Sequence, residues 1–289
     1  MTTETGRPTE GPTETSQAAP ASPSNWAAPV SRLEVGPKPG GALNLNVAGR
    51  RLAGPVQGFG QLWQKTYRVR LAGIAVTPEA IIRTWKQNFG AFWPKGNHFY
   101  GPLTSLQPGE VALLDLALPG KMTLSTGVLV IFADDESFAF MTPEGHQFAS
   151  FITFSSYDDG GVPVIQIQAL LRASDPLYEL SMPIVAQRTE DRFWRDTLQS
   201  LAAHFGASET TVEMQRVCVD RRRQWRYAGN IRQNAAIRTA LYKLTHLTRW
   251  WWGPGRTAWR RRSPWLGPAV RSSSTKAPTP SAAACAVLS

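Results

Sequence analysis

The sequence predicts an α+β domain in which a curved antiparallel β-sheet grips a long C-terminal helix. Three observations predict this class. Five segments of β-type sequence follow one another between residues 110 and 172, an amphipathic helix pattern precedes them, and a longer one follows them. The turns between the five segments are short, which requires antiparallel neighbours, because a parallel pair needs a crossover of a dozen residues or more. A curved sheet of this kind needs a helix to cover its concave face.

The N-terminal part is expected to be a disordered segment over residues 1–40. It consists largely of Thr, Pro, Ser, Glu and Ala and contains little that could be buried. Residues 36–41 read G-P-K-P-G-G, which is typical of a linker, and the apolar residues that follow alternate as in a short strand: Leu43, Leu45 and Val47.

A strand and then a helix are predicted between residues 65 and 93. Tyr67, Val69 and Leu71 alternate, the register slips near Gly73, and Ile74 and Val76 resume on the other parity, which predicts a strand with a bulge. Thr77-Pro78-Glu79 supplies a helix cap, a first-turn proline and an acidic first turn. Apolar residues then recur at helical spacing up to Pro94: Ile82, Trp85, Phe89 and Phe92.

The antiparallel meander is expected at residues 110–118, 121–133, 137–142, 147–157 and 162–172. Turn residues separate these segments, including Pro119-Gly120, Asp134-Asp135, Pro143-Glu144-Gly145 and Asp158-Asp159-Gly160-Gly161. Asp175-Pro176 then begins the long helix, which Pro183 is expected to kink or split and which Gly206 ends. A further strand is expected near Val217 and Val219.

Two stretches carry a resemblance to known proteins. Residues 138–146 read F-A-F-M-T-P-E-G-H before a Phe-rich strand, and residues 169–176 read A-L-L-R-A-S-D-P before the long helix. With the element order, they resemble the START-like helix-grip superfamily (SRPBCC), and within it a bacterial and plant domain family of unknown function. The resemblance covers about residues 60–206, inside a domain that we place at residues 41–208. It implies a seven-stranded sheet and an apolar cavity, and we expect the seventh strand within residues 41–64.

A cavity for a small apolar ligand or lipid is the function that the resemblance favours. The apolar parities of the strands, together with the first helix, predict the residues that would line it: Trp85, Phe89, Trp93, Val128, Val130, Phe132, Phe140, Ile152, Phe154, Ile165 and Ile167. The alternative is that these side chains simply fill the core.

Candidates for catalysis are few, so a non-enzymatic role is favoured over a cyclase- or hydrolase-like enzyme of the same fold. The candidates are His98, Asp115, Glu144 and His146, since a carboxylate beside a histidine can perform acid–base chemistry. The family tends to carry acidic residues after Gly-His, whereas this chain has Gln147-Phe-Ala-Ser-Phe, so a role tied to those carboxylates is not carried over. Cys218 and Cys285 are 67 residues apart without metal-ligand spacing, and we expect no metal or other cofactor.

The C-terminal part is strongly basic. Residues 209–289 contain 15 Lys and Arg against 3 Asp and Glu, whereas the rest of the chain has a net charge of −2. Residues 209–252 predict a basic amphipathic helical extension, and residues 253–289 a disordered tail rich in Trp, Arg, Ser, Ala and Pro. Contacts with an anionic membrane are expected from Arg221, Arg222, Arg223, Trp250, Trp251, Trp252, Arg260, Arg261 and Arg262. Docking of the extension on the domain and binding of nucleic acid are the alternatives.

The chain lacks a secretion signal and any run of about 18 apolar residues. We therefore expect a cytoplasmic protein that binds an apolar molecule and associates peripherally with the inner face of the membrane.

Overall fold

The computed structural model describes residues 22–37, 41–101, 106–118, 120, 122–181, 187–207 and 210–251, the last five of these by their backbone only. Pro183 and the expected tail over residues 253–289 lie outside the described residues. Contacts group residues 1–246 into one compact unit and residues 247–289 into a second. Of the described helices, none combines the length and hydrophobicity that crossing a membrane requires.

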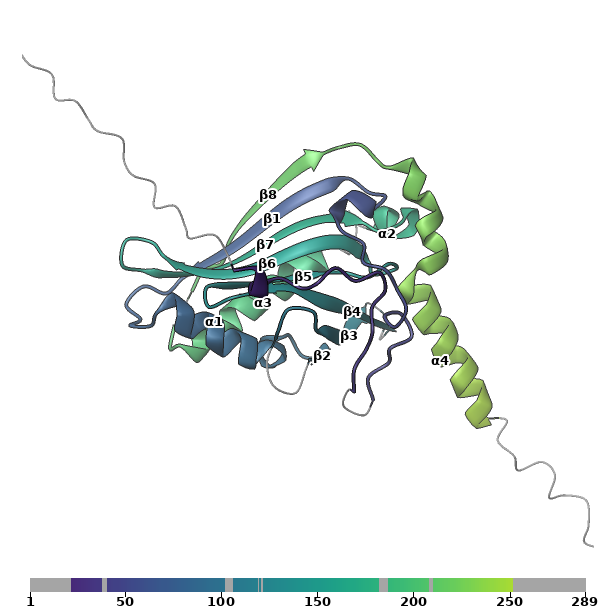
Figure 1. The fold of residues 1–289 in the computed structure, drawn as a ribbon, viewed down its shortest axis with the longest axis horizontal. Helices are drawn as coiled ribbons and strands as arrows, with labels where there is room; N and C mark the ends of the chain where they lie inside the picture. Colours follow the sequence, from purple (N-terminus) through teal and green to yellow (C-terminus); the bar gives the residue numbers. More distant parts are fainter. Residues whose placement is uncertain are drawn as a thin grey trace, which may run out of the picture. The chain divides into compact units, whose positions relative to one another are not determined.

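One antiparallel sheet forms the centre of the fold (Figure 1). Its strands are β1 (Leu62–Arg70), β2 (His98–Tyr100), β3 (Val111–Leu118), β4 (Met122–Ala133), β5 (Ser137–Met141), β6 (Phe148–Asp158), β7 (Pro163–Ala173) and β8 (Glu213–Asp220). They are ordered β2-β3-β4-β5-β6-β7-β1-β8, so β3 to β7 form the predicted meander. The chain then returns to place β1 and β8 beside β7. The predicted α+β class is confirmed.

Two details of the strand prediction are wrong. The structure has no strand between residues 41 and 61, where we expected one, and it has an unpredicted short strand, β2. The edge strand β8 confirms the strand expected near Val217 and Val219. The first strand does not continue past a bulge, because β1 ends at Arg70 and Gly73 turns the chain with a φ of 76°. An L-residue rarely adopts this left-handed conformation, and the turn leads directly into the next helix.

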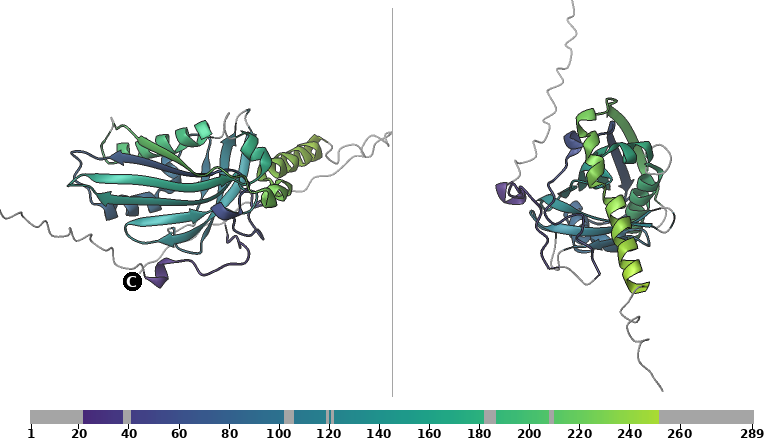
Figure 2. Two further views of the ribbon diagram at one scale, coloured as in Figure 1. Left: turned by 90° about the horizontal axis from the view of Figure 1, so that it is seen from above. Right: turned by 90° about the vertical axis from the view of Figure 1, so that its right-hand side faces the viewer.

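The helices α1 (Pro78–Gln87), α2 (Pro176–Ser181) and α3 (Gln187–His204) follow the predicted pattern. Thr77 caps α1, where its hydroxyl accepts a hydrogen bond from the Ala80 N–H at 3.3 Å. A 3₁₀ turn, η3 (Phe89–Phe92), continues α1. The two views in Figure 2 show the sheet curved around the helices, with α1 and α3 on its concave side.

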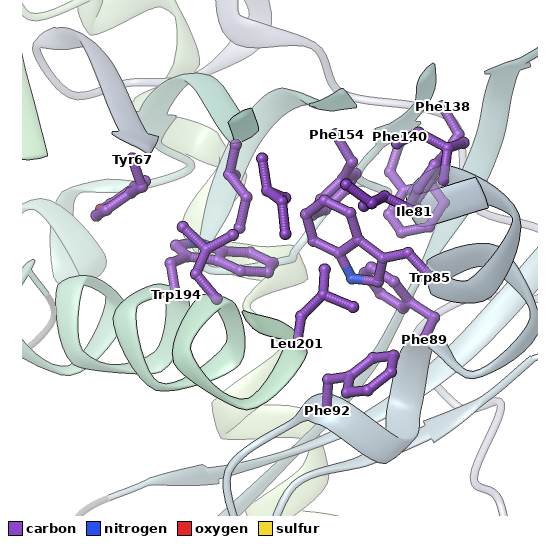
Figure 3. Close-up of a cluster of buried hydrophobic side chains, with 14 of the residues drawn as sticks. Tyr67, Ile81, Trp85, Phe89, Phe92, Phe138, Phe140, Phe154, Trp194 and Leu201 are labelled. Atoms are coloured by element: carbon purple, nitrogen blue, oxygen red, sulfur yellow. The ribbon is translucent and has the colours of Figure 1, made fainter. Parts of the chain in front are cut away.

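Aromatic side chains fill much of the space between the sheet and the helices (Figure 3). Trp85 of α1 is fully buried and meets Phe138 and Phe154 edge-on, at centroid distances of 5.7 and 5.2 Å. Trp194 of α3 contacts Phe154 from the other side at 5.5 Å. Burial of each such side chain contributes roughly 2–3 kcal/mol, so these contacts hold both helices on the sheet.

The segment before β1 covers the convex face, although we expected its first part to be disordered. Trp26 packs on Phe132 at a centroid distance of 4.6 Å, and Leu33 is 1% exposed in a second cluster with Val47 and Leu129. A Cβ at Gly127 would stand 2.8 Å from the Val47 side chain, so this glycine permits the close approach. A few apolar residues are enough to hold this segment, because they pack against apolar side chains that the sheet already presents.

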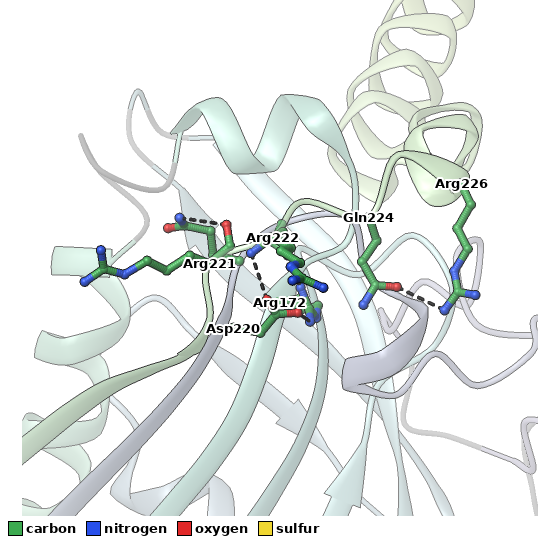
Figure 4. Close-up of polar contacts among 8 residues, drawn as sticks. Arg172, Asp220, Arg221, Arg222, Gln224 and Arg226 are labelled. Atoms are coloured by element: carbon green, nitrogen blue, oxygen red, sulfur yellow. Dashed lines mark hydrogen bonds and ion pairs between the residues drawn. The ribbon is translucent and has the colours of Figure 1, made fainter.

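The chain after α3 also packs on the domain. It forms β8, the 3₁₀ segment η6 (Trp225–Gln233) and α4 (Ala235–Trp251). Buried Arg172 donates to the carbonyls of Gly60 and Arg222 and pairs with Asp220 at 2.6 Å, which fastens the end of β8 to β7 (Figure 4). Asn234 donates to Asp175 at 2.8 Å immediately before α4 begins.

The first turns of α4 are held by polar contacts. Asn46 donates to the Ser125 carbonyl at 2.8 Å and to the Thr239 hydroxyl at 3.0 Å. The Ala235 N–H donates to the Gly145 carbonyl at 2.9 Å. The first turns of α4, within the basic extension, therefore dock on the domain.

Candidate functional site

A cavity of about 310 Å³ lies between the concave face of the sheet and α3. Its inner part is apolar and aromatic, with Phe89, Phe99, Phe140, Phe193 and Trp194 among its walls. Met122 lines the cavity and is 57% exposed, so the cavity reaches the surface at the end of the sheet where β4 begins. Its size and apolar walls are typical of small-molecule sites.

Polar groups line one part of the cavity. The β5–β6 connection and the start of β6 contribute Thr142, His146, Gln147 and Ser150, and α3 contributes Glu190. Ser150 Oγ, Glu190 Oε1 and Trp93 Nε1 are buried and have no hydrogen-bond partner among the described residues. Buried polar atoms without partners are uncommon in folded proteins, because each loses its hydration without compensation.

Five of the eleven residues predicted to line the cavity do so: Phe89, Trp93, Val128, Phe140 and Ile152. Five others belong to the packed core around it: Trp85, Val130, Phe154, Ile165 and Ile167. Phe132 is on the opposite face. The β4–β5 register shifts between Val130 and Phe132, and this bulge turns Phe132 toward Trp26. Simple alternation along β4 could not show the shift.

Two of the catalytic candidates, His98 and Asp115, lie on the convex face. They are cross-strand neighbours on β2 and β3, and His98 stacks on Tyr100, which packs in the convex cluster. Asp115 accepts hydrogen bonds from Ser125 at 2.5 Å and Tyr100 at 3.3 Å. Two hydroxyl groups are thus the hydrogen-bond partners of this carboxylate.

The other two candidates, Glu144 and His146, do not form a pair. Glu144 binds the Arg51 guanidinium at 3.0 Å outside the cavity, whereas His146 is buried and lines the cavity. Its Nδ1 lies 3.1 Å from both the N–H and the carbonyl of Phe148. Burial lowers the pKa of His146 to about 4, so its ring is neutral near pH 7.

A buried charge network, which the sequence analysis did not identify, adjoins the cavity. Lys65 of β1 is fully buried, and its Nζ lies 2.7 Å from Glu190 Oε2 and 2.7 Å from Asp191 Oδ1. Tyr67 donates to the same Asp191 oxygen at 2.6 Å. The signal available in the sequence was Lys65 itself, which has the parity of the buried residues Tyr67 and Val69.

The network changes the protonation of its members. Burial by itself disfavours the Lys65 cation, but the adjacent Glu190 and Asp191 outweigh it and raise the pKa of Lys65. Burial raises the pKa of Glu190, and Lys65 offsets only part of that effect. Burial also raises the pKa of Tyr67, which stays protonated. Lys65 is therefore cationic, and burial favours the protonated form of Glu190.

The arginines expected to contact anions are placed differently from one another. Arg221 and Arg222 are exposed, and Arg221 extends away from the contacts in Figure 4. Arg223 is bound to Glu179 at 2.9 Å. Trp252 and Arg260 to Arg262 lie outside the described residues, as do the side chains of Trp250 and Trp251.

No family model matches the chain, and no curated protein matches it in sequence. Solved structures with similarity include Ms6760 from Mycobacterium smegmatis, at 11% identity and a TM-score of 0.38 over 50% of this chain and 92% of that chain. Ara h 8.0201 has 11% identity and a TM-score of 0.38, over 50% and 99% of the two chains. The di-domain ARO/CYC StfQ from the steffimycin biosynthetic pathway has 8% identity and a TM-score of 0.39, over 50% of each chain. We infer neither ligand nor activity from likeness at this level.

Proposed function

We propose that this protein binds a small, mainly apolar molecule in the cavity between the sheet and α3. The observation that supports this proposal is the cavity itself, with a volume of about 310 Å³ and largely aromatic and aliphatic walls. A domain that only needed a filled core would lose packing contacts by keeping such a space. The START-like resemblance of the sequence agrees with this role.

The binding role is proposed to be non-enzymatic. Of the four catalytic candidates, His146 alone lines the cavity. Its Nδ1 accepts a hydrogen bond from the Phe148 N–H, and Glu144, the carboxylate two residues before it in the sequence, is bound to Arg51. A general acid or base must lie within hydrogen-bond reach of the proton that it transfers, and the other three candidates do not line the cavity.

Binding of 2-methylnaphthalene, measured by equilibrium dialysis, tests the proposal. Leu116 lines the cavity and is only partly buried, so Leu116→Trp places a larger ring in the space. We expect saturable one-to-one binding by the native chain and at least a tenfold loss in this variant. Val217→Trp, on the exposed face of β8, is the matched control and should bind as the native chain does. Equal binding by all three proteins would place the probe elsewhere and contradict the proposal.

A second role, association with an anionic membrane, is favoured by one face of the C-terminal extension. Ile237 and Leu241 stand one helical turn apart on α4 and are 41% and 58% exposed. The segment from residue 209 onward has a net charge of +12. An exposed apolar stripe on a basic helix fits the surface of a bilayer that contains acidic lipids.

Sedimentation with phosphatidylcholine vesicles, with and without phosphatidylserine, tests the membrane role. We expect binding that requires phosphatidylserine and that falls several-fold in Leu241→Glu but not in Val217→Glu. Salt-sensitive binding to duplex DNA, without binding to either kind of vesicle, would instead favour the nucleic-acid alternative.

A further inference from the structure

We propose that the cavity selects apolar molecules that carry a neutral hydroxyl group, and that Glu190 binds this hydroxyl. The inference rests on the proposed function, because it assigns the chemistry of the same cavity. The Glu190 carboxyl group is buried, and only one of its two oxygens has a hydrogen-bond partner among the described residues.

The two oxygens of Glu190 have different surroundings. Oε2 accepts a hydrogen bond from Lys65 at 2.7 Å, whereas Oε1 is buried with no hydrogen-bond partner among the described residues. The nearby Trp194 indole weakly favours the ionised carboxylate, but it makes no hydrogen bond of normal geometry with Oε1. Glu190 is 8% exposed and lines the cavity. A ligand in the cavity can therefore supply the missing partner.

The remaining contacts of the network keep Glu190 in place. Lys65 is also bound to Asp191 at 2.7 Å, and Asp191 accepts a further hydrogen bond from Tyr67 at 2.6 Å. Lys65 and Tyr67 belong to the same strand, so β1 holds both carboxylates at the start of α3. The Glu190 carboxyl group is thus positioned before any ligand arrives, which lowers the entropic cost of binding.

Two further polar atoms of the cavity wall also lack a hydrogen-bond partner among the described residues. Ser150 Oγ on β6 and Trp93 Nε1 after η3 are buried without partners among the described residues. The indole N–H can only donate, whereas the serine hydroxyl can both donate and accept. An oxygen-bearing ligand is able to satisfy either atom, and a pure hydrocarbon satisfies neither.

The charges favour a neutral group over an ion. Of the described residues that line the cavity, none is Lys or Arg, so an anionic ligand would be buried beside Glu190 without a cation in contact. A cationic ligand would compete with Lys65 for the Glu190 carboxyl group, whose protonated form is favoured by burial. A hydroxyl donates to the ionised carboxylate and accepts from the protonated carboxyl group, so it fits Glu190 in both states.

A matched series of two-ring probes tests this inference by equilibrium dialysis: 2-naphthol, 2-methylnaphthalene, 2-naphthoate and 2-naphthylmethylamine. The first two differ by a hydroxyl in place of a methyl group, and the last two carry opposite charges at neutral pH. We expect the native chain to bind 2-naphthol about tenfold more tightly than 2-methylnaphthalene, and both ions more weakly than 2-naphthol. Hydrophobic transfer alone favours 2-methylnaphthalene, so the expected order requires a polar contact.

The variants Glu190→Met and Ser150→Ala locate that contact. Glu190→Met should remove the preference while 2-methylnaphthalene still binds, because Lys65 remains paired with Asp191. Ser150→Ala removes an unpartnered hydroxyl and serves as a mild second variant, with a smaller loss of preference. Circular dichroism shows whether each variant folds.

Three outcomes would overturn the inference. They are a native chain without preference for 2-naphthol, tighter binding of either ion, or a preference that is unchanged in folded Glu190→Met. The first two need no variant, so the inference is testable even if Glu190→Met does not fold. Binding of 2-methylnaphthalene in any of these cases leaves the proposed function intact, and failure of all four probes to bind the native chain would contradict both.

Discussion

Lys65 is the residue on which the buried part of the site depends. It is fully buried and is the cation that the structure places against Glu190 and Asp191, at 2.7 Å from each. Removing one partner of a buried ion pair is costly, because the charge left behind is neither solvated nor compensated. Lys65 therefore stabilises the Glu190 carboxyl group in its buried position at the cavity wall.

The variant Lys65→Met should lower the free energy of unfolding by about 3–5 kcal/mol, as is typical when one partner of a buried pair is lost. Urea denaturation measures this change. The double variant Lys65→Met/Glu190→Met should recover part of the loss, since it also removes a carboxylate that has lost its cation. Equal stability of the single and double variants would show that the Lys65–Glu190 contact is not responsible.

His146 predicts a specific pH dependence. Its pKa is about 4 in the folded chain and about 6.5 when unfolded, so the unfolded chain binds the additional proton between these values. His146 therefore makes its full contribution to the free energy of unfolding above pH 6.5. As the pH falls from 6.5 to 4, the free energy of unfolding decreases by roughly 3 kcal/mol on account of this residue.

The variant His146→Asn isolates this effect, because an amide oxygen is able to accept the same Phe148 N–H. Its free energy of unfolding should fall less than that of the native chain between pH 7 and pH 4. The raised pKa of Glu190 acts in the opposite direction, but it is common to both proteins and cancels in the difference. Parallel curves for the two proteins would contradict a buried neutral His146.

At the scale of elements, the β5–β6 turn is where both extensions of the domain meet the sheet. Pro143 forms a bridge to Leu52, Glu144 binds Arg51, and the Gly145 carbonyl accepts the Ala235 N–H. Gly145 has a φ of 88°, and a Cβ there would collide with the Gln233 carbonyl. The sequence predicted a turn at Pro143-Glu144-Gly145, but not that both extensions dock on it.

The variant Gly145→Ala should destabilise the chain and loosen the segment that docks on this turn. We expect faster hydrogen exchange at residues 225–239 and a lower melting temperature. Gly160→Ala is the matched control, because Gly160 also has a positive φ, of 65°, but a Cβ there would lie more than 4 Å from every atom beyond its chain neighbours. It should cost only about 1 kcal/mol of backbone strain. Equal effects of the two variants would show that the contact with Gln233 is unimportant.

Local signals predicted the elements well. The Thr77 cap, the Gly-rich turns and the alternation within β3 to β7 depend on near neighbours in the sequence, and the predicted helices and meander agree with the structure. The bulge that turns Phe132 to the convex face depends on pairing with β5, so the pattern of β4 alone could not reveal it. The packing of Trp26 and Leu33 on the sheet was likewise missed, since their own segment is poor in apolar residues.

For the whole molecule, the sequence predicted the architecture better than the site. Phe89, Trp93, Val128, Phe140 and Ile152 line the cavity as predicted. Which apolar positions leave a space and which fill it is decided by packing between the sheet and α3. Lys65 and Glu190 are 125 residues apart in sequence, so their contact arises only when α3 crosses β1.

Native mass spectrometry of the full chain, purified from its own host, tests the central claim most directly. We predict a one-to-one complex with a small molecule that is released on denaturation and is absent from Leu116→Trp. Repeated detection of the bare chain, together with no binding of 2-methylnaphthalene by the native protein, would contradict a ligand-binding cavity.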